Sequence, residues 1–243
     1  MVLLSTFLLL GGCGNIAHHF LESKIDLNKD YVIIADIKEI NKKFVSNSHI
    51  LHFKMDISDE NQYTDLINYL DDANIKIDKI LFSVGINPMS NFFTANVNDF
   101  KNTFDKNFFS VYITLKKVYH YINDIASIVV IASQNGLVGH EDRVDYGPSK
   151  AALIQLVKNL TIDFNKYSHK DIKINCISPG YVLTSNNEQF FASPRGKKLL
   201  SKNIRKYPVL LDEVSETIAF LFESKTVSYR GQNLIIDNGY TIT

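Results

Sequence analysis

Cysteine is scarce in this sequence, and net charge is absent. Only Cys13 and Cys176 occur in 243 residues, so no disulfide framework can form, and sparing use of thiols fits a reducing compartment. We therefore expect a cytoplasmic protein. The 26 basic residues balance 26 acidic ones, which removes the electrostatic basis for nucleic acid or an anionic membrane as the main partner. A small molecule is the expected ligand.

The sequence also lacks internal repeats, low-complexity tracts and Pro/Ser-rich linkers. Its first apolar run is far shorter than the roughly 20 residues that a membrane-spanning helix needs. Hydrophobic residues nevertheless make up 45% of the chain and aromatic residues 12%, enough for a substantial core. We therefore predict a single domain over residues 1–243.

The segment STFLLLGGCGNIAHHF at residues 5–20 admits two interpretations. Its Leu-Gly-Gly-Cys resembles the end of a lipoprotein signal, with Cys13 as the lipidated residue. However, no Lys or Arg precedes Lys24, whereas a secretory signal begins with a positively charged region. The alternative is a strand that enters a glycine-rich phosphate loop. We favour this alternative, because cleavage before Cys13 would remove the strand and half of the loop.

Short apolar runs alternate with longer helical patterns along the chain. Most runs are apolar at consecutive positions, as expected of strands covered on both faces. The alternation predicts an α/β Rossmann fold, a doubly wound, seven-stranded parallel sheet with helices on both faces. Functional residues should then follow the strand ends. The predicted strands are 6–10, 31–36, 50–56, 79–85, 127–133, 173–180 and 232–237, and the predicted helices are 14–22, 60–74, 96–123, 146–167 and 212–224.

Small residues follow the first strand at the spacing of a dinucleotide-binding loop, namely Gly11, Gly14 and Ala17. They permit a tight turn and let backbone N–H groups approach a pyrophosphate at a helix N-terminus. About twenty residues later, Asp36 ends the second strand, where an acid accepts hydrogen bonds from the adenosine ribose and repels a 2′-phosphate. With no basic residue directly beside Asp36, we expect NAD rather than NADP. The alternative for Asp36 is a solvated strand-end carboxylate.

Two further strand ends fit the same cofactor. Asp56 follows the third strand and would face the adenine. Gly85 ends the fourth strand and would let the backbone approach the adenine-side ribose. Aspartate and glycine are also ordinary turn residues after a strand. The prediction therefore rests on the position of Asp56 and Gly85 at strand ends more than on their residue type.

Tyr146 and Lys150 lie four residues apart, on one face of a predicted helix. Pro148 lies in the first turn, where a missing N–H costs least. A nearby ammonium stabilises phenolate and lowers a tyrosine pKa from its usual value of about 10, so Tyr146 can exchange a proton with a substrate oxygen. A solvated Tyr–Lys pair is the alternative.

Ser133 and Asn107 complete the catalytic prediction. Ser133 ends the fifth strand, where its hydroxyl can bind the reacting oxygen. Asn107 lies within the long predicted helix, where an amide can hold a kink or a water that links the lysine to solvent. Alternatively, Ser133 ends a turn and Asn107 is an exposed helical residue.

Taken together, these residues resemble the short-chain dehydrogenase/reductase family, of the single-domain type, over essentially the whole chain. The resemblance also includes NCISPGYVLT at 175–184 and GQNLIIDNGYT at 231–241. The sequence departs from the family pattern before and within the glycine loop, after the fourth strand and near the C-terminus. The departing residues are Leu10, Asn15, Ala17, Ser83, Val84 and Asn238.

The resemblance implies reversible hydride transfer between NAD(H) and a secondary alcohol or ketone. Tyr146 is then the general acid/base, and Lys150 binds the nicotinamide ribose and lowers the tyrosine pKa. Ser133 polarises the carbonyl, and Asn107 supports a proton relay. No metal is expected. The implied cofactor contacts are Gly11, Gly14, Asn15, Ile16, Asp36, Asp56, Ile57, Ser83, Val84, Gly85, Tyr146, Lys150, Pro179, Gly180, Val182 and Thr184.

The resemblance also implies a homodimer or homotetramer, formed by the helix at 98–123 and the helix that carries Tyr146. The expected activity is that of a dehydrogenase of sugars, polyols or sugar phosphates of surface polysaccharide metabolism. Three alternatives differ from it in cofactor or in site residues. A 3-ketoacyl reductase of fatty-acid synthesis would normally use NADP, against which Asp36 argues. A non-catalytic NAD sensor would usually lack Tyr146 or Lys150. A lipoprotein would lose its phosphate loop.

Residues 183–208 are expected to cover the substrate. This segment is strongly basic, and the loop after Ser133 is polar, which suits a hydroxylated or anionic substrate. A solvated amphipathic helix is the alternative for the basic segment, and we favour it slightly. The basic residues are Arg195, Lys197, Lys198, Lys202, Arg205 and Lys206, against Glu188; the polar set is Gln134, Asn135, His140, Glu141 and Arg143.

Overall fold

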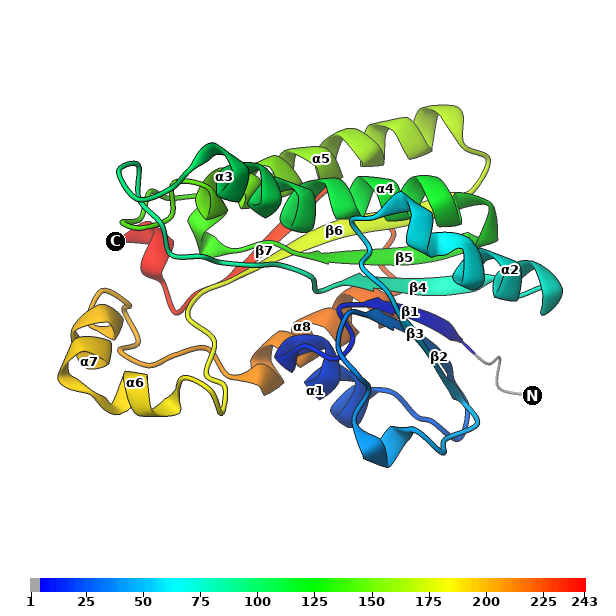
Figure 1. Cartoon of the computed structure of the whole chain (residues 1–243), viewed down its shortest axis with the longest axis horizontal. Coiled ribbons are helices and arrows are strands. Elements are labelled where there is room, and N and C mark those ends of the chain that lie inside the picture. The colour runs from blue at the N-terminus through cyan, green and yellow to red at the C-terminus, as the bar shows by residue number, and fades with distance from the viewer. Residues whose placement is uncertain (1–4) are drawn as a thin grey trace.

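The computed structural model describes residues 5–243 and contains one seven-stranded sheet (Figure 1). The strand order is β3-β2-β1-β4-β5-β6-β7, and every neighbouring pair is parallel. The predicted doubly wound sheet is confirmed. The strands are β1 (Thr6–Leu10), β2 (Tyr31–Asp36), β3 (Ile50–Lys54), β4 (Ile77–Phe82), β5 (Ile122–Ile131), β6 (Asp171–Pro179) and β7 (Asn233–Ile236).

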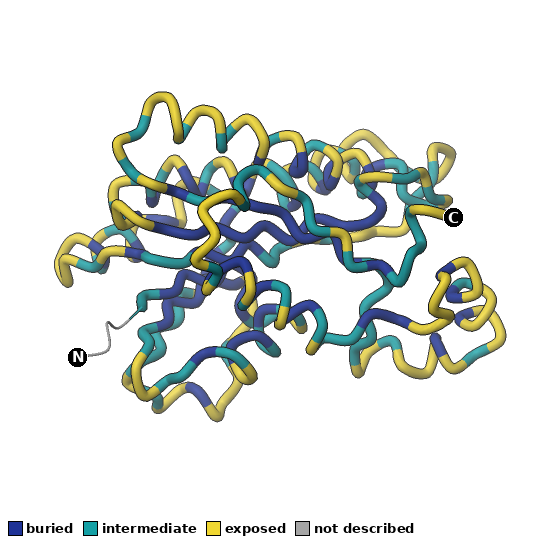
Figure 2. The backbone as a smooth tube through the Cα atoms, turned by 180° about the vertical axis from the view of Figure 1, so that it is seen from behind, coloured by how far each residue is buried: buried dark blue, intermediate teal, exposed yellow. Residues whose placement is uncertain are grey.

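Consecutive apolar residues of each central strand serve two separate cores. In β1, Leu8 and Leu10 belong to one hydrophobic cluster, while Phe7 and Leu9 belong to the other. Successive side chains of a strand point to opposite faces, so a strand covered on both sides reads as an uninterrupted apolar run. The two layers of helices cover the buried sheet in Figures 1 and 2.

Two helices, α1 (Asn15–Lys24) and α8 (Leu211–Glu223), cover one face. The other face carries α2 (Thr64–Asp72), α3 (Val97–Phe104), α4 (Ser110–Val118) and α5 (Tyr146–Tyr167). The predicted range of α5 is reproduced, and α1, α2 and α8 fall within or beside their predicted ranges.

The single helix predicted over 96–123 is wrong. The structure divides it into α3 and α4, joined by a π-helical turn at Asp105–Phe109, and its last residues already belong to β5. The wide turn contains Asn107, whose side chain is hydrogen-bonded to the backbone of Ile86. A tertiary contact thus reshapes the helix.

The sheet reverses its winding between β1 and β4, so a crevice opens at the carboxyl ends of these strands. The segment at 183–208 contains two short helices, α6 (Glu188–Ala192) and α7 (Pro194–Leu200), which project beside this end of the sheet (Figure 1). Within residues 5–243, no helix has both the length and the apolar character needed to span a membrane. Within the segment that resembles a lipoprotein signal, Thr6–Leu10 form β1, as the favoured alternative predicts. Met1 to Leu4 lie outside the described residues.

Candidate active site

The loop after β1 is shaped by two glycines. Gly11 has φ +76°, and a Cβ there would lie 2.8 Å from Val84 Cγ2, so a larger residue would be strained and would collide. Gly14 caps α1 with extended backbone and without a side-chain hydrogen bond. Because the cap has no side chain to cover the first turn, the helix N-terminus suits an anion. This cradle fits the pyrophosphate of a dinucleotide.

Asp36, the last residue of β2, is hydrogen-bonded to the loop that follows β1. Its Oδ2 accepts a hydrogen bond from the Cys13 backbone N–H at 2.9 Å, and its Oδ1 accepts one from the Lys38 N–H at 2.9 Å. Burial, assisted by the charge of Asp36, raises the pKa of the Cys13 thiol to about 11. Cys13 therefore remains a protonated thiol at neutral pH, beside a carboxylate held at the predicted adenosine end of the site.

Tyr146 and Lys150 occupy the first two turns of α5, whose N-cap is Asp145. The Lys150 side chain is only 3% exposed. Its Nζ donates a hydrogen bond to Ile131 O at 3.0 Å and lies 5.8 Å from the centroid of the Tyr146 ring. The end of β5 thus fixes the lysine beside the tyrosine.

Burial is the largest influence on the pKa of Tyr146 and on that of Lys150. It lowers the pKa of Lys150 to about 8, because a desolvated ammonium loses its charge more readily. Burial raises the pKa of Tyr146, while a hydrogen bond with Ser133 and the positive charge of Arg143 lower it. Without cofactor or substrate, the phenol is therefore protonated at neutral pH.

Asn107 is fully buried and binds the backbone of Ile86 at two points. Its Oδ1 accepts from the Ile86 N–H at 2.7 Å, and its Nδ2 donates to Ile86 O at 2.9 Å and to Ser149 Oγ at 3.0 Å. The sequence predicts that this amide holds a kink or a water, and the structure has a π-helical turn at this position. The alternative of an exposed helical residue is wrong. Asn107 also lies close to Lys150, because a Cβ on Gly85 would come within 3.2 Å of Lys150 Nζ and 3.4 Å of Asn107 Oδ1.

A cavity of about 200 Å³ opens at the carboxyl ends of β4, β5 and β6. It brings together most of the predicted catalytic and nicotinamide-side residues. Asn87, Ile131 and Ala132 also line it and were not predicted, although each lies within a few residues of a predicted strand end. The predicted residues that line the cavity are Ile16, Ser83, Val84, Gly85, Ser133, Tyr146, Lys150, Pro179, Gly180 and Val182.

Seven predicted cofactor residues do not line this cavity. Gly11, Gly14, Asn15 and Asp36 belong to the loop after β1, to the start of α1 and to the end of β2, and the other three are Asp56, Ile57 and Thr184. Asp56 forms an ion pair with Lys106 and accepts hydrogen bonds from Ser58. Burial acts to raise the pKa of Asp56, but these partners outweigh it and lower that pKa. Ile57 is buried in the core, and the Thr184 N–H donates to Asn187 Oδ1 at 2.8 Å.

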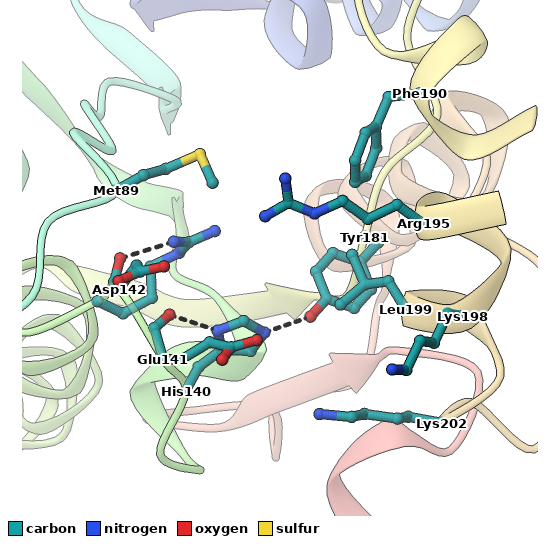
Figure 3. Close-up of a pocket in the computed structure, with 11 residues that line it drawn as sticks. Met89, His140, Glu141, Asp142, Tyr181, Phe190, Arg195, Lys198, Leu199 and Lys202 are labelled. Atoms are coloured by element: carbon teal, nitrogen blue, oxygen red, sulfur yellow. Dashed lines mark hydrogen bonds between the residues drawn. The ribbon is translucent and has the colours of Figure 1, made fainter. Parts of the chain in front are cut away.

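A second pocket, of about 290 Å³, lies beside the first. Figure 3 shows Arg195, Lys198 and Lys202 on one side and His140 with Glu141 on the other. The basic segment and the polar loop, which were predicted separately, therefore share one pocket. Tyr181 and Met89 also line it, and neither was predicted.

Comparison with known proteins places the chain in a family. The family model described as enoyl-(acyl carrier protein) reductase, a short-chain dehydrogenase model, matches residues 15–241. The chain belongs to the short-chain dehydrogenase/reductase family. It is an oxidoreductase that acts on CH–OH groups of secondary alcohols or on the corresponding ketones, and its cofactor is a nicotinamide dinucleotide.

Individual relatives differ in substrate. A cyclopentanol dehydrogenase of Comamonas is 24% identical over 89% of this chain and 85% of its own. An NAD-dependent glycerol dehydrogenase of Listeria innocua is 27% identical over 87% of this chain and 84% of its own. The structure of a 4-hydroxyisoleucine dehydrogenase complexed with NADH has a TM-score of 0.87, 25% identity and coverage of 98% and 99%. A solved structure of an ElxO variant, with a TM-score of 0.84, 24% identity and coverage of 99% and 100%, has NADPH bound.

Proposed function

We propose that this chain is an NAD(H)-dependent dehydrogenase of a hydroxylated small molecule, of the sugar, polyol or sugar phosphate class. The observation that carries the proposal is the convergence of Ser133, Tyr146 and Lys150 on one cavity at the carboxyl ends of the strands, with Asn107 behind them. Polar side chains around the neighbouring pocket, including His140 and Arg143, support a hydroxylated rather than an apolar substrate.

The chain's own residues would handle the proton. The nicotinamide, when bound, supplies or accepts the hydride. In reduction, Tyr146 gives its phenolic proton to the carbonyl oxygen, and Ser133, which lines the same cavity, donates to the same oxygen. The Lys150 ammonium stabilises the resulting phenolate. In oxidation, Tyr146 takes the proton back.

Asp36 supports the choice of NAD over NADP. Its carboxylate is held by the N–H groups of Cys13 and Lys38, at the strand end where the adenosine ribose binds in this fold. A fixed negative charge there accepts from ribose hydroxyls and repels a 2′-phosphate. Lys38 is hydrogen-bonded to this carboxylate through its backbone N–H.

Replacing Tyr146 tests the catalytic assignment. Tyr146→Phe removes the transferable proton and should lower kcat by roughly 100-fold or more, while NADH binding, followed by fluorescence titration, persists. Turnover is measured as NADH oxidation with a panel of keto-sugars, ketose phosphates and acyl thioesters. Tyr167→Phe, on an exposed tyrosine at the other end of α5, is the matched control. Full activity of Tyr146→Phe would refute the assignment, and turnover of acyl thioesters alone would indicate a 3-ketoacyl reductase.

Cofactor choice is tested at Asp36. The native chain should show a higher kcat/KM with NADH than with NADPH, and Asp36→Asn should shift this ratio toward NADPH by about tenfold, the effect of a loss of some 1.4 kcal/mol of repulsion. Asp72→Asn, on an exposed residue of α2, should leave the ratio unchanged. A native preference for NADPH would contradict the proposal.

A further inference from the structure

The pocket of about 290 Å³ beside the catalytic cavity has walls from two distant segments. Arg143 comes from the loop before α5, whereas Arg195 and Lys198 come from α7 and Lys202 from the turn after it. In Figure 3, the side chains of Arg195, Lys198 and Lys202 extend toward the loop that carries His140 and Glu141. Four basic side chains therefore meet two acidic ones, Glu141 and Asp142.

The positive charge in this pocket is not balanced by the protein. Within residues 5–243, none of these four basic residues forms an ion pair, whereas Lys24, Lys43 and Lys54 on the surface all do. One of the two acids is engaged elsewhere, because Asp142 Oδ1 accepts from Asn91 Nδ2 at 3.1 Å. An anionic ligand would supply the missing negative charge.

The pocket adjoins the reaction centre through two residues. Tyr181 lies between Gly180 and Val182, both of which line the catalytic cavity, and its hydroxyl is hydrogen-bonded to His140 Nε2 at 2.7 Å. Arg143 O accepts from the Gly147 N–H at 3.0 Å, one residue after Tyr146. A substrate whose reacting carbon faces Tyr146 can therefore extend a second group into this pocket.

We propose that this pocket binds a phosphate group of the substrate, so that the chain acts on a phosphorylated sugar or polyol. The inference rests on the proposed dehydrogenase function. A phosphate monoester carries close to two negative charges and three peripheral oxygens, which match two unbalanced cations and their several N–H donors. A carboxylate would neutralise only one of these charges.

The first test compares small ketones that differ in one group. Dihydroxyacetone, dihydroxyacetone phosphate and hydroxypyruvate supply a neutral, a phosphate and a carboxylate arm. The native chain should favour the phosphate arm in kcat/KM, and the double variant Lys198→Gln with Lys202→Gln should lower the phosphate-to-neutral ratio about tenfold or more. Lys197→Gln removes an exposed lysine of α7 that does not line the pocket, and it should leave the ratio unchanged. An equal ratio in native and double-variant protein, or a native preference for hydroxypyruvate, would overturn the inference.

The second test does not depend on turnover. Inorganic phosphate is titrated into the NAD-saturated protein and followed by phosphorus NMR, so that the pyrophosphate loop is already filled. Saturable binding with a Kd at least tenfold weaker in the double variant, and unchanged in Lys197→Gln, is expected. Binding of equal strength in all three proteins, or no saturable binding to the native chain, would refute the phosphate site. If no ketone is turned over while this titration succeeds, the dehydrogenase proposal fails and the site stands.

Discussion

The buried position of Lys150 in the site lowers the stability of the folded protein. Its ammonium is buried and, among residues 5–243, forms one hydrogen bond, to Ile131 O. Burial lowers its pKa from 10.5 to about 8. Such a shift is a statement about stability, since the unfolded chain keeps its proton over a range where the folded chain has lost it. The residue that makes Tyr146 useful thus destabilises the free protein.

The size and sign of this cost can be measured. Below about pH 8, Lys150 is charged in both the folded and the unfolded chain, and its burial destabilises the folded chain by about 3 kcal/mol. This value follows from the pKa shift at about 1.36 kcal/mol per pKa unit. Between about pH 8 and pH 10.5 the penalty is relieved. The free energy of unfolding of the native chain, relative to Lys150→Met, should therefore rise by about 3 kcal/mol across this range, as measured by urea unfolding without cofactor.

The comparison with Lys150→Met is needed because other groups titrate in the same range. Burial raises the pKa of Cys13 to about 11, and this contribution cancels when two variants are subtracted. Lys158→Met, on an exposed residue of the same helix, controls for the loss of a lysine. A flat difference between the native chain and Lys150→Met would show that the buried ammonium costs nothing.

At the scale of elements, the strands and α5 could be predicted because their signals are local. The runs 6–10 and 31–36 coincide with β1 and β2, since both faces of these strands are buried and no polar residue interrupts them. The range 146–167 coincides with α5, which begins directly after the capping residue Asp145. The positions of Gly85, Ser133 and Pro179 in the site could be predicted because each lies at or just after a strand end, and parallel strands place their carboxyl ends at one edge of the sheet.

Other features could not be predicted because they depend on contacts between distant elements. The π-helical turn at Asp105–Phe109 forms where Asn107 binds the backbone of Ile86, 21 residues away. Asp56 forms an ion pair with Lys106, which is 50 residues away in the sequence. The basic segment and the polar loop were each visible in the sequence, but their meeting in one pocket depends on where α7 projects. The amphipathic helix favoured for the basic segment is replaced by two short helices.

At the scale of the whole molecule, exposed apolar side chains remain on the outer layer of helices. Tyr112 on α4 is 46% exposed, and Ile162 on α5 is 62% exposed. Burial of these side chains against a second copy would remove apolar surface from water. They lie on the two helices predicted to form the subunit interface, so a homodimer or homotetramer stays our prediction.

Sedimentation at micromolar concentration measures this assembly. The native chain should sediment as a dimer or tetramer, and Tyr112→Glu with Ile162→Glu should shift it toward monomer, since charges at an apolar contact are costly. Val45→Glu changes an equally exposed residue away from α4 and α5 and should have no effect. A native chain that sediments only as monomer would contradict the prediction.

The pairing of β1 with β4 has a consequence beyond the shape of the sheet. It aligns Phe7 with Lys79, and the loops that follow these two strands meet where Gly11 faces Val84. The cradle for the dinucleotide therefore does not exist until the two halves of the chain have come together. A ligand that binds only the assembled state adds its binding free energy to folding stability, about 1.4 kcal/mol for each tenfold excess over its Kd. The lifetime of this protein would then follow the concentration of free nicotinamide dinucleotide around it as well as the packing of its own core.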